Sequence, residues 1–136
     1  MLLVPDVGLT NLLDLLTAAW GDTLEVGLFN TAHAPDPSDV PGTYTAIEAT
    51  FPGYARQTLE NWTPALLIAS GFAQTEADVV TWTRGAGAGT EDIFGYFVLD
   101  ASGNLLWAES PPWAPVTIDT LGQQLAFLPR FSLQPQ

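Results

Sequence analysis

The sequence contains no cysteine and no lysine, and its cationic side chains are three arginines and one histidine. Without cysteine the chain has no disulfide framework, no thiolate metal site and no cysteine nucleophile. The 15 acidic residues give a formal net charge of −12, which opposes binding to nucleic acid, because such binding neutralises phosphates with cations. The shortage of cationic side chains likewise opposes binding to anionic membrane surfaces. We therefore expect no nucleic acid and no membrane as partners.

Long hydrophobic runs and a secretion signal are also missing. The first residues, MLLVPDVG, carry no basic side chain, and their apolar run stops at Pro5. No stretch approaches ~18 uncharged apolar residues, so we expect no transmembrane helix. A chain of 136 residues that is 47% hydrophobic is long enough for one domain with a single core. We expect an N-terminal arm at residues 1–8 and one folded domain at residues 9–136.

One helix is expected near the N-terminus, at about residues 10–20. Thr10 or Asn11 would cap it, leucines recur at helical spacing, and Gly21 follows as a C-terminal stop. Pro5 would separate the preceding residues from this helix as an arm that reaches elsewhere.

After Gly21 the apolar residues recur with a period of two, which is typical of strands. The period holds at residues 24–28, at Val80 and Trp82, and in a hairpin at residues 92–110 whose turn is DASGN. Turn signals recur roughly every ten residues and separate about seven or eight short strands. We therefore expect a mainly β fold: an antiparallel β-sandwich, jelly-roll-like, with one short N-terminal helix.

Three segments need separate interpretation. Residues 63–73, TPALLIASGFA, are apolar enough for a strand covered on both faces or for a short buried helix. Pro129 places the last strand at an edge or a bulge. In EATFPGYARQTL, residues 48–59, Pro52 and Gly53 form a turn between extended segments, and Arg56 is expected at an edge or an interface.

Histidine and acidic residues offer weak sites for metal chemistry. His33 lies in a proline-rich loop near Asp36 and Asp39, but one histidine without cysteine cannot build a zinc site of the usual kind. Nothing in the sequence places a serine beside it for a catalytic triad. The two aspartates, or the turn at residues 100–104, could bind calcium through oxygen, although neither has the spacing of a calcium loop.

Two enzymatic alternatives lack a defining pattern. The glycine-rich RGAGAGTED at residues 84–92 lacks the Gly-Lys-Ser/Thr ending of a phosphate-binding loop. A glycosidase needs two carboxylates at the right separation, and the sequence does not select a pair. The candidates are Glu48, Glu60, Glu91, Asp92 and Glu109. We expect no enzyme, no cofactor and no metal site.

Aromatic residues are abundant, with five tryptophans and seven phenylalanines. Three of the tryptophans, at positions 62, 82 and 107, fit core or half-core strand positions. Trp113 stands in PPWAP, where it either packs under its loop or anchors a subunit contact or ligand surface. The interface candidates are Leu2, Leu3, Arg56 and Trp113.

Two stretches, EATFPGYARQTL and FGYFVLDASGNLLWAE, resemble a group of short virion proteins of tailed bacteriophages. The N-terminal LVPDVGLTNLLDLL, the strand LEVGLFNT and the final LAFLPRFSL occur in the same order, so the resemblance runs from about Leu2 to Leu133. It implies a structural role on the particle, as a capsid decoration or cement subunit or a minor head or tail component. The group lends no catalytic residue.

This resemblance implies assembly in the bacterial cytoplasm, a place in the virion, and the major capsid protein or other virion proteins as partners. We expect a symmetric homo-oligomer, and a trimer because decoration sites often lie on local threefold axes. The alternative is a tail-fibre or tail-tip module that binds a receptor or carbohydrate, since tryptophan-rich β-sandwiches suit sugar stacking. A weak hydrolase is the third hypothesis.

Overall fold

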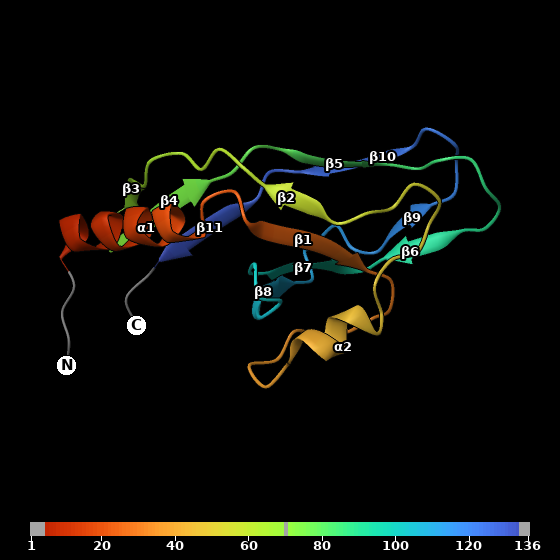
Figure 1. Ribbon diagram of the computed structural model, residues 1–136, viewed down its shortest axis with the longest axis horizontal. Coiled ribbons are helices and arrows are strands. Elements are labelled where there is room, and N and C mark those ends of the chain that lie inside the picture. Colours follow the sequence, from red (N-terminus) through yellow and green to blue (C-terminus); the bar gives the residue numbers. More distant parts are fainter. Residues whose placement is uncertain (1–4, 70, 134–136) are drawn as a thin grey trace.

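The computed structural model describes residues 5–69 and 71–133, and it is mainly β with antiparallel sheets and an N-terminal helix (Figure 1). This confirms the expected fold class at that level. The described part contains eleven strands and two helices, more elements than the sequence predicted. The added helix is the short α2 (Pro41–Thr45) in the proline-rich loop region.

Helix α1 (Asp6–Trp20) begins earlier than the expected start at about residue 10. Pro5 precedes it, and its carbonyl oxygen accepts the N–H of Leu9 at 3.1 Å. Proline suits this boundary because the first N–H groups of a helix have no intrahelical acceptor. Gly21 ends the helix at φ +52°, a conformation that favours glycine. Residues 6–8 are therefore helical and do not belong to an arm, and residues 1–4 lie outside the described residues.

The strands pair into four antiparallel sheets, in the orders β2-β1-β7-β8, β11-β4-β3, β10-β5 and β6-β9. These pairings do not close into a barrel. The predicted hairpin is confirmed as β7 and β8 joined by residues 100–104. The strand bounds are β1 (Leu24–Phe29), β2 (Gln57–Leu59), β3 (Leu66–Ala69), β4 (Phe72–Glu76), β5 (Val80–Thr83), β6 (Glu91–Ile93), β7 (Gly95–Leu99), β8 (Leu105–Glu109), β9 (Val116–Ile118), β10 (Gln124–Phe127) and β11 (Arg130–Leu133).

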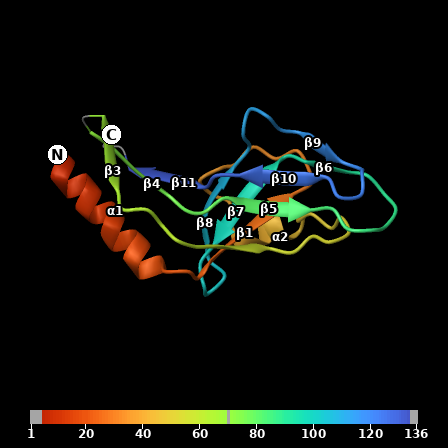
Figure 2. The same cartoon turned by 90° about the horizontal axis from the view of Figure 1, so that it is seen from above.

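The β11-β4-β3 sheet and the β10-β5 sheet are built from consecutive strands of the same two chain segments. β4 is succeeded by β5, and their partners β11 and β10 are likewise consecutive (Figures 1 and 2). The pairing register shifts by one residue between the two sheets. At that shift the N–H of Ala77 donates to the carbonyl oxygen of Pro129 at 3.1 Å. Proline cannot donate to a ladder, so the predicted irregularity at Pro129 is confirmed.

The sheet of β1 and β7 is buried on both faces. On one face, Val26 and Val98 belong to the same buried cluster as Trp82 of β5. On the other face, Phe97 stacks on Tyr44 of α2, with ring centroids 5.6 Å apart. Successive strand residues point to opposite faces, so one strand pair supplies both clusters.

Four aromatic side chains join α1 to the rest of the fold. This aromatic junction consists of Trp20, Trp62, Trp107 and Phe131, with contacting ring centroids 5.1–5.9 Å apart. It connects the end of α1 with β8 and β11, and Trp62 comes from the segment that leads to β3. The core or half-core strand positions predicted for Trp82 and Trp107 are confirmed, whereas Trp62 is half-buried against the core but lies outside a strand.

For residues 63–73 the strand alternative is confirmed, but the burial expected for it is wrong at β3. This segment contains the strand β3, whose four side chains are all exposed, and the start of β4. The buried face of α1 packs Leu9 and Leu13 against Ala73 of β4, which leaves β3 at the margin of the sheet. Apolar composition alone does not distinguish a central strand from a marginal one.

Gly95 provides a test of the central packing, because a Cβ atom there would overlap the backbone carbonyl oxygen of Glu109. We expect Gly95→Ala to lower the free energy of unfolding by about 1–3 kcal/mol, since a backbone oxygen cannot move aside as a flexible side chain can. Urea denaturation followed by tryptophan fluorescence measures this change. Gly42→Ala is the matched control, because nothing lies within 4 Å of its Cβ position. Equal stability of the two variants would contradict the packing.

Candidate functional site

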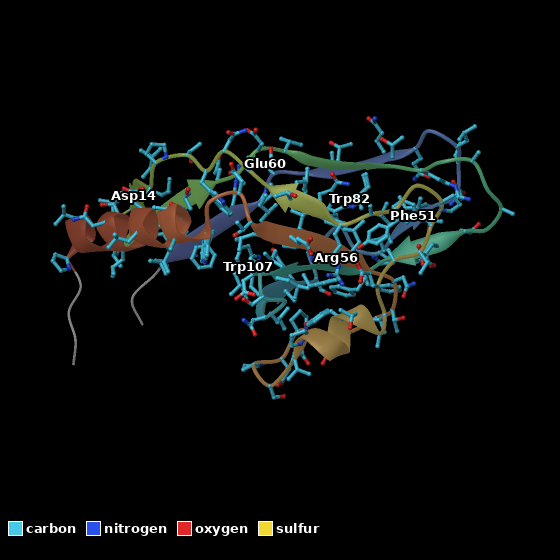
Figure 3. All side chains as sticks on the ribbon, in the orientation of Figure 1. Asp14, Phe51, Arg56, Glu60, Trp82 and Trp107 are labelled. Carbon is cyan, nitrogen blue, oxygen red and sulfur yellow. The ribbon has the colours of Figure 1, made fainter. Side chains whose placement is uncertain are left out.

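Arg56 lies just before β2 (Figure 3). It binds acidic side chains of its own chain. Its Nε and Nη2 donate to Oε1 and Oε2 of Glu48 at 2.8 and 2.7 Å. The Tyr54 hydroxyl donates to Glu48 Oε1 at 2.7 Å and accepts the N–H of Leu28 at 3.0 Å. We call Glu48, Tyr54 and Arg56 the Arg56 clamp. It fixes the segment before β2 against β1.

The predicted turn at Pro52 and Gly53 is confirmed and is packed closely. Gly53 has φ +86°, and a Cβ atom there would lie 2.9 Å from backbone atoms of Thr83 and Gly85. The carbonyl oxygen of Pro52 also accepts the N–H of Gly85 at 2.6 Å. Together with the Arg56 clamp, this turn joins two parts of the core. The guanidinium of the interface candidate Arg56 is therefore used within the chain.

Protonation in the Arg56 clamp favours a fixed arrangement. Burial would raise the pKa of Glu48, but hydrogen bonds from Arg56 and Tyr54 outweigh it and place that pKa below the ordinary value. Burial, together with the hydrogen bond to Glu48, raises the pKa of Tyr54. Near neutral pH Glu48 is therefore an ionised acceptor and Tyr54 a protonated donor. Such a pair supports structure and does not exchange a proton.

His33 and the aspartates of its loop bind one another. Asp39 Oδ2 accepts the backbone N–H of Asp36 at 2.9 Å, lies 2.8 Å from His33 Nε2, and accepts the Tyr44 hydroxyl at 2.7 Å. In that order these hydrogen bonds lower the pKa of Asp39 to about 2. One carboxylate oxygen thus organises the loop over α2. Within residues 5–69 and 71–133, no three His, Asp or Glu side chains group together as metal ligands.

The carboxylate of Asp100, in the turn after β7, accepts hydrogen bonds from within that turn. Asp100 Oδ1 accepts the N–H groups of Ser102 and Asn104, both at 2.8 Å. Asp100 Oδ2 accepts the side-chain amide of Asn104 at 2.9 Å. The hydrogen bonds from Asn104 contribute most to lowering the pKa of Asp100. This is the hydrogen bonding of an Asx-type turn, which closes the hairpin.

The carboxylates considered for hydrolysis are dispersed in separate local contacts. Glu91 accepts the N–H groups of Thr50 and Phe51 at 2.9 and 2.8 Å. Asp92 accepts the Thr117 hydroxyl, and Glu109 accepts the Tyr96 hydroxyl. Glu60 differs, because its contact is made by the backbone: its carbonyl oxygen accepts the N–H of Asp78. These contacts brace strands and turns, and they give no reason to pair two of the acids for catalysis.

Trp113, another interface candidate, is 40% exposed and lines a surface groove of about 390 Å³. We call it the Trp113 groove. Its lining combines apolar Phe127 and Leu128 with polar Gln74, Arg130 and Ser132. The groove therefore joins the PPWAP loop to the β10–β11 junction and to one face of the β11-β4-β3 sheet.

Exposed aliphatic side chains gather at the α1 end of the molecule. The α1 surface consists of Val7, Leu12, Leu15 and Leu16, which are 37–67% exposed. The β3 edge consists of β3 with Leu66, Leu67 and Ile68, which are 44–63% exposed. Contiguous apolar surface of this kind is typical of interaction sites. The candidates Leu2 and Leu3 lie outside the described residues.

The α1 surface and the β3 edge are separated around the helix. Asp6 and Asp14 accept the N–H groups of Gly71 and Ala65 at 2.7 Å each, which fixes this side of α1 to the two ends of the β3 region. At 100° per residue, Leu12 and Leu16 each lie roughly 160° around the helix from Asp14. Leu15 lies about 100° and Val7 about 20° from Asp14, so Leu12 and Leu16 form the flank of the α1 surface that a partner can contact independently of the β3 edge.

Comparison with protein-family models found no matching family, and comparison with curated proteins and with solved structures found no match. Neither described helix has the length and hydropathy to span a membrane.

The Arg56 clamp predicts a stability that depends on pH. The folded-state pKa of Glu48 lies below the ordinary value of a glutamate carboxyl, so its contribution to stability is complete above that ordinary value and is lost as the pH falls through the folded-state pKa. Replacing the cation in Arg56→Met should cost about 1–3 kcal/mol at pH 7, because it leaves a half-buried carboxylate without its main donor. It should also remove part of the acid dependence. Urea unfolding between pH 7 and pH 3 measures both effects.

Arg130→Met is the matched control for this prediction. The Arg130–Glu76 pair is equally short, at 2.8 Å, but the Arg130 side chain is 60% exposed against 29% for Arg56. An exposed pair contributes little to stability, so we expect a loss of less than about 1 kcal/mol. If both variants lose the same stability and keep the same acid dependence, the clamp has no special role.

Proposed function

We propose that this chain is a structural protein of a tailed phage particle, a capsid decoration or cement subunit that binds and stabilises the shell through oligomeric contacts. The observation that carries the proposal is the α1 surface, an aliphatic face on a helix that is itself anchored by the aromatic junction. The resemblance of the chain's motif order to that of short virion proteins of tailed bacteriophages supports the same role. The proposed location is the virion, and the proposed partner is the major capsid protein.

Binding would come from removing the aliphatic side chains of α1 from water. Apolar burial contributes about 25 cal/mol per Å², so one small patch binds weakly, but many copies on one shell add up. The net charge of −12 would limit association with other acidic surfaces. The jelly-roll-like sandwich belongs to this proposal, and the core shared by β1, β7 and β5 supports a two-layered, rigid body.

Shell binding can be tested with empty expanded shells of the phage that carries the gene for this chain. We expect the purified chain to cosediment with these shells and to raise their melting temperature in differential scanning calorimetry. Leu12→Glu/Leu15→Glu should weaken binding by roughly tenfold or more, because two aliphatic contacts are replaced by charges.

Leu121→Glu is the control for that experiment, since Leu121 is 69% exposed in a turn away from α1. It should bind shells as the unchanged chain does. Circular dichroism of the double variant shows whether α1 remains folded. A folded chain that neither cosediments with shells nor changes their melting temperature would refute the shell-binding proposal.

A second candidate function is the binding of a receptor glycan at a tail fibre or tail tip. It is favoured by the Trp113 groove, where an exposed indole lies beside Gln74, Arg130 and Ser132. Aromatic faces stack on sugar rings, and neighbouring polar groups bind hydroxyls. This combination of an exposed indole and polar side chains supports glycan binding as the second candidate function.

Glycan binding predicts a specific loss at Trp113. We expect Trp113→Ala to abolish binding to host cell-wall or surface glycans on an array, while Trp113→Phe keeps part of it because a stacking face remains. Shell binding should be unchanged in both variants, since Trp113 lies outside the α1 surface. Equal glycan signals from Trp113→Ala and the unchanged chain would remove this candidate.

A further inference from the structure

We propose that two copies of this chain associate through the β3 edge, with β3 of one copy antiparallel to β3 of the other about a twofold axis. This deepens the oligomer part of the proposed function but can be tested without a shell. It concerns a surface distinct from the α1 surface. The contact would join the three-stranded sheets of two copies into one continuous sheet.

β3 has an open edge on the side away from β4. β3 pairs with β4 on one side and stands at the end of its sheet, and in the described part of the chain β4 is its sole strand partner. All four of its side chains are exposed, which holds for no other described strand. Natural proteins block exposed edges with charges, lysine or proline, because open edges pair with other chains. Leu66–Ala69 contains no charge and no proline, and although it is only four residues long and its pairing with β4 is irregular between Leu67 and Ala69, its outer side carries none of these side-chain blocks.

The charge of the chain indicates that the partner at the β3 edge is a second copy. A chain of net charge −12 repels its own copies, so two copies can meet closely only where acidic side chains are absent or directed inward. β3 itself has no charged residue; of the neighbouring aspartates, Asp6 is half-buried and Asp14 is exposed, and each accepts one backbone N–H of its own chain. A cationic partner would find no acidic side chain on this strand. A second copy meets no like charge directly across from it.

The side chains of β3 are complementary to those of β3 in a second copy. In an antiparallel pair of two copies, leucine, isoleucine and alanine of one strand meet the same residue types of the other in any register. Paired edges also exchange backbone hydrogen bonds, which supply affinity and direction. Leu12 and Leu16, on the other flank of α1, would stay free for a further partner.

The resulting assembly differs from the threefold arrangement expected from the sequence. Pairing identical strands is isologous, so it closes after two copies. Size-exclusion chromatography with multi-angle light scattering therefore separates the two ideas. We expect a mass of twice 14.6 kDa that falls toward the single-chain mass on dilution.

The decisive variant is Leu66→Lys/Ile68→Lys, because lysine on an edge strand prevents pairing. It should give the single-chain mass with an unchanged circular dichroism spectrum, since both side chains are already exposed, at 63% and 57%. Leu121→Lys, which changes an equally exposed leucine elsewhere, should keep the dimer. Removal of residues 1–4 should also keep it.

Hydrogen exchange of the unchanged chain gives a second test that needs no variant. Amide protons in β3 should exchange more slowly as the protein concentration rises, while those of β2 should not change. A single-chain mass at high concentration, a trimer, or a dimer that survives the double lysine variant in its folded state would overturn the proposal. So would a dimer lost on removal of residues 1–4, which would place the contact on that segment. Shell binding by a monomeric double variant would separate this result from the proposed function.

Discussion

The structure depends on burying both faces of the β1–β7 pair. Most antiparallel sheets cover one face and leave the other in water, but here α2 and its loop cover the second face through Tyr44 and Phe97. Close approach is possible because Gly27 and Gly95 carry no side chain where Phe97 and Phe29 lie. The Arg56 clamp and the Asp39 loop then hold the covering segments in place.

Sequence reasoning succeeded where one period dominates a segment. The alternation in β1 and β5 and the hairpin turn at residues 100–104 predict local geometry, because side-chain direction and turn closure are set within a few residues. It failed where the outcome depends on distant partners. β3 looks buried by composition, yet its position was decided by α1 packing on Ala73 of β4. The start of α1 was missed because Pro5 was interpreted as a break and not as the residue that precedes a helix.

The same distinction applies to the candidate sites. Trp113 was found by its rigid proline frame, and the structure adds the polar side chains that line its groove. Arg56 was found as an unusual residue, but its partner Glu48 lies across a turn, and no periodic pattern signals such a pair. The leucines of α1 recur at helical spacing, which predicts a helix. A helix at the end of a molecule, however, buries only the narrow face formed by Leu9, Leu13 and Thr17.

The aromatic junction has an optical consequence. Trp20 lies 5.8 Å from Trp62 and 5.9 Å from Trp107, so their indole transitions are close enough to couple. The near-ultraviolet circular dichroism and the fluorescence emission of these tryptophans therefore report whether α1 is packed on the rest of the fold. Any event that lifts or tilts this helix can be followed in real time without a dye.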